Sequence, residues 1–114
     1  MRVIAYNISE QEKALLTKAN AKVHDLTFIS NPLTEDTVLY VAGTEVILIS
    51  EHDLLQKPML QRLFDLGVRS VITRSLLTSH IDLDAAGALN MHVANTPFAD
   101  QSPEGLAKQT MDNL

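Results

Sequence analysis

Five short apolar runs, each starting about 22 residues after the one before it, are the feature that most constrains the fold of this chain. The runs begin near Arg2, His24, Glu45, Arg69 and Met91. Each interval has room for a strand, a helix and two tight loops. The runs at 3–6, 46–49 and 68–72 are almost continuously apolar, as expected for parallel strands that are covered on both faces. The spacing therefore predicts five βα units, with these three runs at the centre of the sheet.

The intervals between the runs carry the start and stop signals of helices. Ser9 followed by Glu12 is a capping box, in which each side chain accepts a hydrogen bond from the other residue's backbone N–H, and it predicts a helix over residues 10–19. Thr34 is expected to cap a second helix over residues 35–42, whose acidic first turn suits the positive end of the helix dipole. The first two intervals are therefore predicted to be helical.

Glycine, proline and polar caps mark the remaining helix ends. Gly43 and Gly67 can adopt the left-handed conformation that ends a helix, and Pro58 suits the first turn of a third helix. Asp82 can cap a short fourth helix, and Ser102 can begin the last one. The prediction is an α/β fold: a flavodoxin-like three-layer sandwich with a five-stranded parallel sheet in the order 2-1-3-4-5.

Composition limits the size and setting of the protein. The 114 residues suffice for one compact domain and are too few for two, so residues 1–114 are expected to form a single domain. No apolar run approaches the roughly 20 residues of a membrane helix. The N-terminus enters an apolar strand at once, without the pattern of a signal peptide. A cytoplasmic location and no membrane partner are predicted.

The amino-acid composition and the formal charge argue against several classes of functional site. The chain has no cysteine, so disulfides, thiolate catalysis and cysteine-ligated metals are excluded. The formal charge of −5 is spread along the sequence, which also has no tryptophan and no basic run. We therefore expect no nucleic-acid partner.

Ligands of a doubly wound sheet bind beyond the carboxyl ends of the strands, where the strand order reverses. The predicted loops at that edge span residues 7–9, 50–53, 74–79 and 96–101. A phosphoacceptor receiver needs acids after the first strand, an Asp after the third and a Lys after the fifth, whereas those places hold Asn7, Ser50 and Thr96. The loop after the first strand lacks the glycine that helps to cradle a flavin phosphate, and no G-x-G-x-x-G occurs. A self-contained nucleotide site is therefore not expected.

The four histidines fall into two pairs. His24 and His92 stand at strand starts, away from the ligand edge, and are expected to be solvated or structural. His52 and His80 stand in loops of the ligand edge, beside acidic residues. A metal-binding or general-base role is conceivable for the second pair, and a solvated loop histidine is the alternative.

Short motifs in a fixed order carry a resemblance to a known family. They are Val3-Ile4-Ala5-Tyr6, Leu33-Thr34-Glu35-Asp36-Thr37-Val38, Gly67-Val68, Thr73-Arg74, Ile81-Asp82 and Asn95-Thr96-Pro97. Each motif is weak alone, but their joint order and spacing are fairly specific. The chain resembles the substrate-binding domain of the D-isomer-specific 2-hydroxyacid dehydrogenases, of the D-lactate dehydrogenase type, over nearly its whole length.

The resemblance implies a division of labour between two domains. In that family a βα domain like this one holds a 2-keto or 2-hydroxy acid, and an inserted second domain brings NAD. The catalytic His, the Arg that binds the substrate carboxylate and the acid paired with the His would all come from sequence beyond this chain. The terminal helix, residues 103–114, would lead into the NAD-binding domain. We therefore expect no catalytic residue and no cofactor site in this chain, and leave its enzymatic activity open.

The resemblance also assigns candidate substrate-binding positions. These are Tyr6, Ser50, His52, Arg74, Ser75, Leu76 and Leu77. The family places a glycine where Leu77 stands, and its backbone N–H groups approach the substrate carboxylate there. Leucine adds bulk at that place. The alternative is a scaffold role, in which Arg74 pairs with a nearby acid, Asp82 caps a helix, and Asn95 helps to hold the loop before that helix.

The last helix has an apolar stripe. Its members are Leu106, Ala107, Thr110, Met111 and Leu114, at helical spacing. The stripe can fold back on the sheet of its own chain or pair with a second copy, and we predict a homodimer to which residues from about Pro97 onward contribute.

Two functions remain open from the sequence. The first is a stand-alone or truncated substrate-binding domain of this dehydrogenase family, inactive by itself. The second is a non-enzymatic module that self-associates and binds a small molecule or a protein through residues 50–53 and 74–80. A small 2-keto or 2-hydroxy acid is the expected ligand under the first reading.

Overall fold

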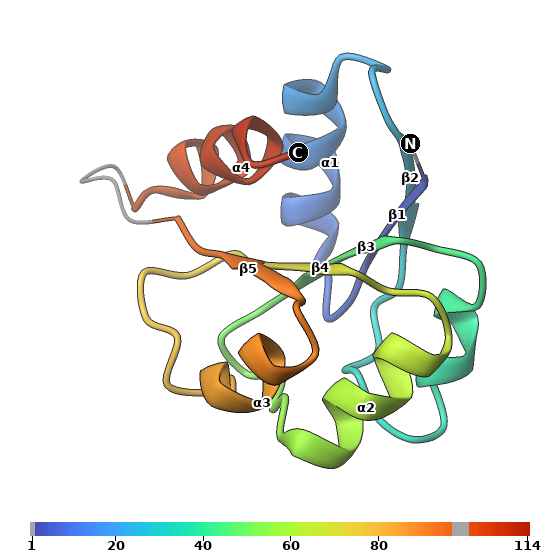
Figure 1. The fold of residues 1–114 in the computed structure, drawn as a ribbon. Coiled ribbons are helices and arrows are strands. Elements are labelled where there is room, and N and C mark those ends of the chain that lie inside the picture. Colours follow the sequence, from blue (N-terminus) through green and yellow to red (C-terminus); the bar gives the residue numbers. More distant parts are fainter. Residues whose placement is uncertain (1, 97–100) are drawn as a thin grey trace.

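A five-stranded parallel sheet forms the centre of the protein (Figure 1). The computed structural model describes residues 2–96 and 101–114. The strands are β1 (Arg2–Ala5), β2 (Asp25–Phe28), β3 (Val46–Ile49), β4 (Ser70–Thr73) and β5 (His92–Ala94). Their order is β2-β1-β3-β4-β5, and every pair is parallel. This confirms the predicted α/β fold and strand order, and it places the reversal of strand order between β1 and β3.

Helices cover both faces of the sheet and complete three layers. The helices are α1 (Glu10–Asn20), η1 (Val38–Val41), α2 (Lys57–Asp65), α3 (Leu83–Ala88) and α4 (Pro103–Asp112). Figure 1 shows α1 and α4 side by side on one face, with α2 and α3 on the other. No helix among the described residues is long and apolar enough to cross a membrane.

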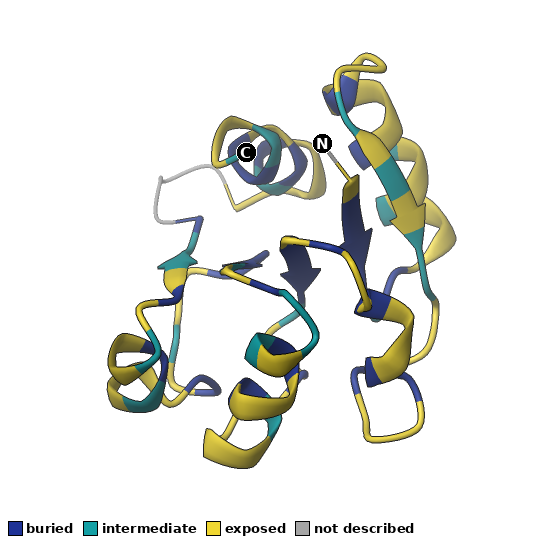
Figure 2. Ribbon diagram, turned by 45° about the vertical axis from the view of Figure 1, so that its right-hand side comes forward, coloured by how far each residue is buried: buried dark blue, intermediate teal, exposed yellow. Residues whose placement is uncertain are grey.

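Alternation along the strands divides the core into two parts. In β1, Val3 and Ala5 pack with Leu16 of α1 and Ala107 of α4. Ile4 contributes to the other part, which contains the buried leucines of α2. Figure 2 shows the buried β1 and β3 lying between helices whose outer faces are exposed. Because both faces of these strands are buried, their continuous apolar sequence is explained.

The predicted helix over residues 35–42 is wrong in extent. Only the short 3-10 helix η1 forms, and Thr37 precedes it. The Thr37 hydroxyl donates to the carbonyl of Pro32 at 2.8 Å and accepts from the backbone N–H of Thr34 at 2.9 Å. These local bonds hold the segment as a turn, because threonine side chains compete with the backbone bonds of a helix. Gly43 has φ +81°, the left-handed conformation expected of it.

Helix α1 has the predicted capping box at its start and an unfavourable residue at its end. The Ser9 hydroxyl accepts from the Glu12 N–H, and Glu12 accepts from the Ser9 N–H. At the other end, Ala21 is left-handed with φ 50° and ψ 36°. An L side chain crowds the backbone in that conformation, whereas glycine does not.

Substituting Ala21→Gly is therefore expected to raise the free energy of unfolding by about 0.5–1 kcal/mol, the strain relieved less the extra flexibility of the unfolded chain. Ala14→Gly, on the exposed face in the interior of α1, is expected to lower it by about 1 kcal/mol instead. Urea unfolding of the two variants measures the opposite signs. Equal destabilisation by both glycines would contradict strain at Ala21.

The terminal helix folds back on its own chain. Ala107 and Thr110 are buried, and Met111 and Leu114 pack against the core that α1 shares with the sheet. Of the two predicted ways to cover the apolar stripe, the structure shows this one. The predicted contributions of residues 97–100 to an edge loop or an interface lie outside the described residues.

Candidate functional site

The carboxyl edge of the sheet is closed from within at the point where the strand order reverses. Asn7 follows β1, and its side-chain amide donates to the Ser50 hydroxyl, after β3, at 3.2 Å. Asn7 is left-handed with φ 58°, a conformation that asparagine tolerates better than most residues. The crevice in which such sheets usually bind ligands is thus bridged by two side chains of the protein.

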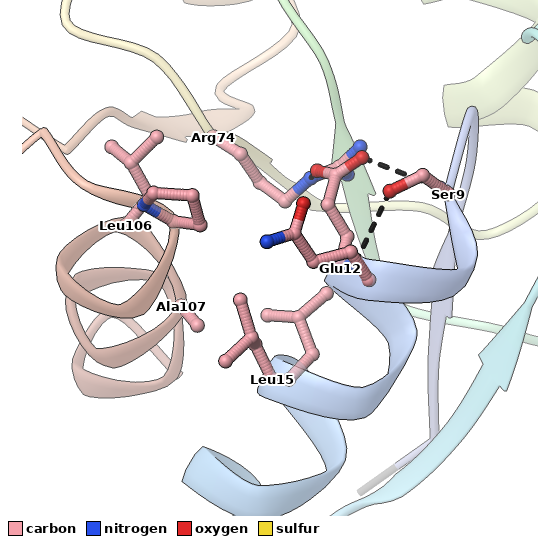
Figure 3. A pocket seen from close by; sticks show the side chains of 9 residues that line it. Ser9, Glu12, Leu15, Arg74, Leu106 and Ala107 are labelled. Carbon is pink, nitrogen blue, oxygen red and sulfur yellow. Dashed lines mark hydrogen bonds and ion pairs between the residues drawn. The ribbon is translucent and has the colours of Figure 1, made fainter.

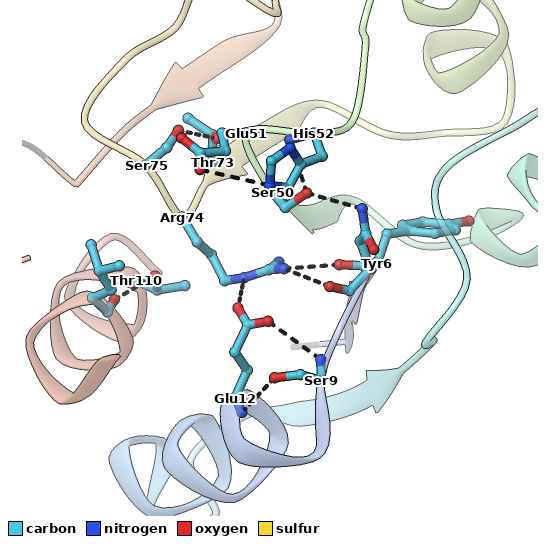
Figure 4. A network of polar contacts seen from close by, with 12 residues as sticks. Tyr6, Ser9, Glu12, Ser50, Glu51, His52, Thr73, Arg74, Ser75 and Thr110 are labelled. Carbon is cyan, nitrogen blue, oxygen red and sulfur yellow. Dashed lines mark hydrogen bonds and ion pairs between the residues drawn. The ribbon is translucent and has the colours of Figure 1, made fainter. Parts of the chain in front are cut away.

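Arg74 ties three elements together at this edge (Figure 4). It follows β4, and its side chain is 3% exposed. Nε donates to Glu12 Oε2 of α1 at 3.1 Å, and Nη2 donates to the carbonyls of Tyr6 at 3.0 Å and Asn7 at 3.4 Å. Burial lowers the pKa of the Arg74 guanidinium, and the neighbouring Glu12 carboxylate partly offsets this. The carboxyl ends of β1 and β4 and the start of α1 are therefore held by one cation.

A pocket opens beside Arg74, between α1 and α4 (Figure 3). Its volume is about 270 Å³. Its lining residues are Ser9, Gln11, Glu12, Leu15, Leu16, Arg74, Pro103, Leu106 and Ala107. One end is polar and the opposite wall is aliphatic, so the pocket has the character of a site for a small amphipathic molecule.

Asp53 fixes the loop after β3. Its side chain is buried, with the residue 1% exposed. Oδ1 accepts from the Leu33 N–H at 3.0 Å, and Oδ2 accepts from the Ser50 N–H at 2.9 Å and from the Ser50 hydroxyl at 3.2 Å. The carboxylate thus joins this loop to the segment that follows β2, and its role is structural.

A buried polar chain runs behind the loop after β4. His80 Nε2 lies 2.9 Å from the Thr73 hydroxyl, which lies 2.7 Å from the Ser75 hydroxyl. Ser75 donates its single proton to the carbonyl of Leu77 at 2.8 Å. Thr73 must therefore donate to Ser75, and His80 Nε2 must donate to Thr73, because each hydroxyl has one proton. The contacts fix His80 as the Nε2–H donor of this chain.

The same loop presents two leucines outward. Leu76 is 50% exposed and Leu77 is 63% exposed. Their carbonyls are held from behind, that of Leu76 by the Asn95 side-chain amide at 2.8 Å and that of Leu77 by Ser75. Their backbone N–H groups donate to no residue within the described ranges 2–96 and 101–114. The loop therefore combines an anchored backbone with two free donors.

The edge belongs to a domain whose sequence matches a known protein family. Residues 3–105 match the family model described as "D-isomer specific 2-hydroxyacid dehydrogenase, catalytic domain". The chain belongs to this family. The resemblance inferred from the short motifs is thereby confirmed.

Curated relatives and solved structures agree with the family model. The chain is 30% identical to a D-lactate dehydrogenase of Escherichia coli over 112 residues, which are 97% of this chain and 33% of that protein. It is 31% identical over 112 residues to a 2-hydroxyacid dehydrogenase homolog of Haemophilus influenzae, with the same coverage of both chains. The apo-structure of the Escherichia coli D-lactate dehydrogenase superposes with a TM-score of 0.83 at 30% identity, covering 88% of this chain and 32% of the other. This family member thus spans about one third of the length of these relatives.

The candidate substrate-binding residues predicted from the sequence lie partly at the carboxyl edge and partly in the core. Arg74, Ser75, Leu76 and Leu77 form one continuous edge loop after β4, and Ser50 follows the adjacent strand β3 and accepts from the Asn7 side chain. Tyr6 is fully buried and donates from its hydroxyl to the Thr37 carbonyl at 2.7 Å. Burial, reinforced by nearby Tyr40 and Asp53, raises the pKa of Tyr6 to about 12. The Tyr6 side chain is therefore a core hydrogen-bond donor at neutral pH.

The histidines at the edge differ from one another. His52 is exposed and lies 3.7 Å from the Glu51 carboxylate. His80 is buried in the polar chain. No cluster of three or more His, Asp or Glu side chains suited to a metal occurs among the described residues.

Sequence reasoning did not identify two residues that shape the site. Glu12 was recognised as half of a capping box, but its bond to Arg74 spans 62 positions and leaves no local signal. Asp53 lies in the predicted edge loop 50–53, but nothing local indicated its structural role. Its three hydrogen bonds depend on the return of the chain after β2. Asp82 does cap α3, as predicted, by accepting from the Ala85 N–H.

His80 gives the protein a specific pH dependence. Burial lowers the pKa of His80 below the usual value of a histidine, about 6.5, although nearby Asp53 and Glu51 act in the opposite direction. The unfolded chain therefore binds a proton before the native state does, and stability is lost as the pH falls below about 6.5. His80→Gln keeps an Nε2–H donor for Thr73 and removes the titration.

We expect the wild-type free energy of unfolding to drop more than that of His80→Gln between about pH 7.5 and about pH 5.5. Denaturant unfolding at the two pH values measures the difference. The exposed His92→Gln variant should keep the wild-type slope. A wild-type slope retained in His80→Gln would exclude His80 as the cause.

Proposed function

We propose that this chain forms the substrate-side wall of an NAD-dependent 2-hydroxyacid dehydrogenase and does not transfer hydride by itself. The observation that carries the proposal is the edge loop at Leu76 and Leu77, whose carbonyls are anchored while their two N–H groups remain free within the described residues. Paired backbone donors of this kind suit a carboxylate. A small 2-keto or 2-hydroxy acid is the proposed ligand.

The hydride step requires a partner region. NAD supplies the hydride chemistry in such enzymes, and the 114 residues contain no G-x-G-x-x-G segment that would hold a dinucleotide. The relatives have about two thirds of their length outside the region matched by this chain. We propose that an equivalent region must close over the edge loop before catalysis, with the α4 segment leading toward it.

A chimera tests this proposal. The part of this chain that matches the Escherichia coli D-lactate dehydrogenase over 112 residues would replace the matching third of that enzyme, and NAD-dependent oxidation of D-lactate would be followed. We expect activity in the chimera and none in the chain alone. Leu77→Gly in the chimera should raise the rate, because it removes bulk beside the two donors.

Leu54→Ala provides the control, because Leu54 is another exposed leucine in a loop at the carboxyl edge. It should leave the rate of the chimera nearly unchanged. A folded chimera that stays inactive with and without Leu77→Gly would contradict the proposal. Hydride transfer by the chain alone would contradict its second part.

A non-enzymatic binding module is the second candidate. The exposed side chains of Leu54, Leu76 and Leu77 stand in two loops of the carboxyl edge and favour contact with another apolar surface. This candidate predicts a folded, inactive chimera and a partner that is lost when both Leu76 and Leu77 are replaced by serine. Co-purification before and after that double substitution distinguishes it from the dehydrogenase proposal.

The homodimer and the cytoplasmic location remain proposals. Since α4 packs on α1 of its own chain, a dimer through the terminal helix would have to use the outer face of that helix, where Lys108 and Asp112 are exposed. Sedimentation at high micromolar concentration tests it. A monomer there would refute the dimer.

A further inference from the structure

We propose that the pocket between α1 and α4 binds the carboxylate of a small aliphatic acid, with Arg74 as the anchoring cation. This site is separate from the edge loop at Leu76 and Leu77, and the inference does not depend on dehydrogenase activity. It rests on an incompletely paired buried guanidinium, on the shape of the pocket, and on a carboxylate of the protein that already occupies one side of Arg74.

The guanidinium has hydrogen-bonding capacity that the described residues do not use. Nε and Nη2 of Arg74 have partners in Glu12 and in the carbonyls of Tyr6 and Asn7. Nη1 is buried and has no hydrogen-bond partner among residues 2–96 and 101–114. A buried donor without a partner is costly, and a charged one more so. An acceptor that reached Nη1 would therefore remove that cost, and its binding would be stabilised accordingly.

The pocket matches a short acid in size and polarity. Its volume of about 270 Å³ is that of roughly nine water molecules, enough for a branched acid of about seven heavy atoms. Leu15, Leu16, Leu106, Ala107 and Pro103 form the aliphatic part of the lining. Figure 3 shows Leu15, Leu106 and Ala107 around the side of the pocket away from Ser9. An aliphatic tail packed there would have its carboxylate toward Arg74.

Glu12 shows what chemistry Arg74 accepts. Its carboxylate lies 3.1 Å from Arg74 Nε, while its side chain is 38% exposed. Arg74 and Glu12 are the two charged residues in the described lining of the pocket. Because part of the Glu12 side chain already reaches solvent, an incoming carboxylate can share the guanidinium with it or take its place. The internal carboxylate also repels the ligand, so removing its charge should strengthen binding.

Titration with 3-methylbutanoate tests the site directly. Methyl NMR of the wild-type chain should show saturable shifts at Leu15 and Leu106 up to about 50 mM ligand, as suits a weakly binding small molecule. The neutral 3-methylbutanamide has the same tail and nearly the same shape. It should bind about tenfold more weakly, because the charged hydrogen bond to Arg74 is lost.

Two variants separate the head group from the tail. Glu12→Gln should tighten 3-methylbutanoate about tenfold and make the acid stabilise the variant more than the wild type in a thermal melt. Leu106→Phe narrows the pocket without touching Arg74 and should weaken the acid about tenfold. Leu83→Phe, at an exposed leucine of α3 outside the pocket lining, should leave the affinity unchanged.

The outcomes decide the proposal. Equal affinity for acid and amide would overturn it, since Arg74 would then contribute nothing. Shifts that persist unchanged in Leu106→Phe, or no shift at Leu15 and Leu106 in the wild type, would also overturn it. An inactive chimera leaves these binding results unaffected, and an active chimera does not supply them, so the two proposals fail separately.

Discussion

Replacing Asp53 with asparagine is expected to lower the free energy of unfolding by about 3 kcal/mol, the largest effect of any single conservative change at this edge. The carboxylate accepts from the N–H groups of Leu33 and Ser50 and from the Ser50 hydroxyl. An amide offers one oxygen, so its NH2 group must face a backbone N–H. Two donors then meet in a place that water does not reach, since Asp53 is almost completely buried.

Urea unfolding of Asp53→Asn measures this loss, and Asp36→Asn provides the control. Asp36 is an exposed acid in the neighbouring turn, and its variant should remain within about 0.5 kcal/mol of the wild type. Similar small effects of both substitutions would show that the loop after β3 does not depend on the carboxylate.

Glu12→Gln is the second large expected effect, a loss of about 2 kcal/mol. The variant keeps a capping-box side chain at the start of α1, so the change isolates the charge. Arg74 is then buried without its counter-ion. We place the loss below the range typical of fully buried pairs because Glu12 is 38% exposed and water screens the pair.

The ion pair of Glu35 with Arg62 is a matched control for that measurement. Its two atoms are 3.4 Å apart, but both side chains are largely exposed, at 62% and 45%. Glu35→Gln should therefore change the free energy of unfolding by less than about 0.5 kcal/mol. If Glu12→Gln and Glu35→Gln cost the same, burial of Arg74 would not be what makes its pair important.

The sequence predicted those features that depend on local chemistry or on strand burial. The capping box of Ser9 and Glu12 needs only four residues, and it forms as expected. The continuous apolar runs gave the inner strands, because strands covered on both faces have no polar side. The prediction of a helix over residues 35–42 was wrong, because the Thr37 hydroxyl bonds to the Thr34 N–H and to the Pro32 carbonyl and holds the segment as a turn.

The site was predictable only in part, because its contacts join distant positions. The loop around Arg74 followed from the strand order, since parallel strands end at one edge. Nothing local indicated that Tyr6 would direct its hydroxyl to Thr37, 31 positions away. The direction of the hydrogen bonds from His80 likewise emerges only when each hydroxyl proton is assigned to one acceptor.

The position of Arg74 also has a consequence for the order of assembly. Its guanidinium bonds to Glu12 and to the carbonyl of Tyr6, across 62 and 68 positions of the chain. During synthesis β1 and α1 leave the ribosome long before β4 does, and contacts between such distant segments are the slow part of folding. A nascent chain that has folded only its first half therefore has an unfinished carboxyl edge, which becomes complete when the fourth strand docks.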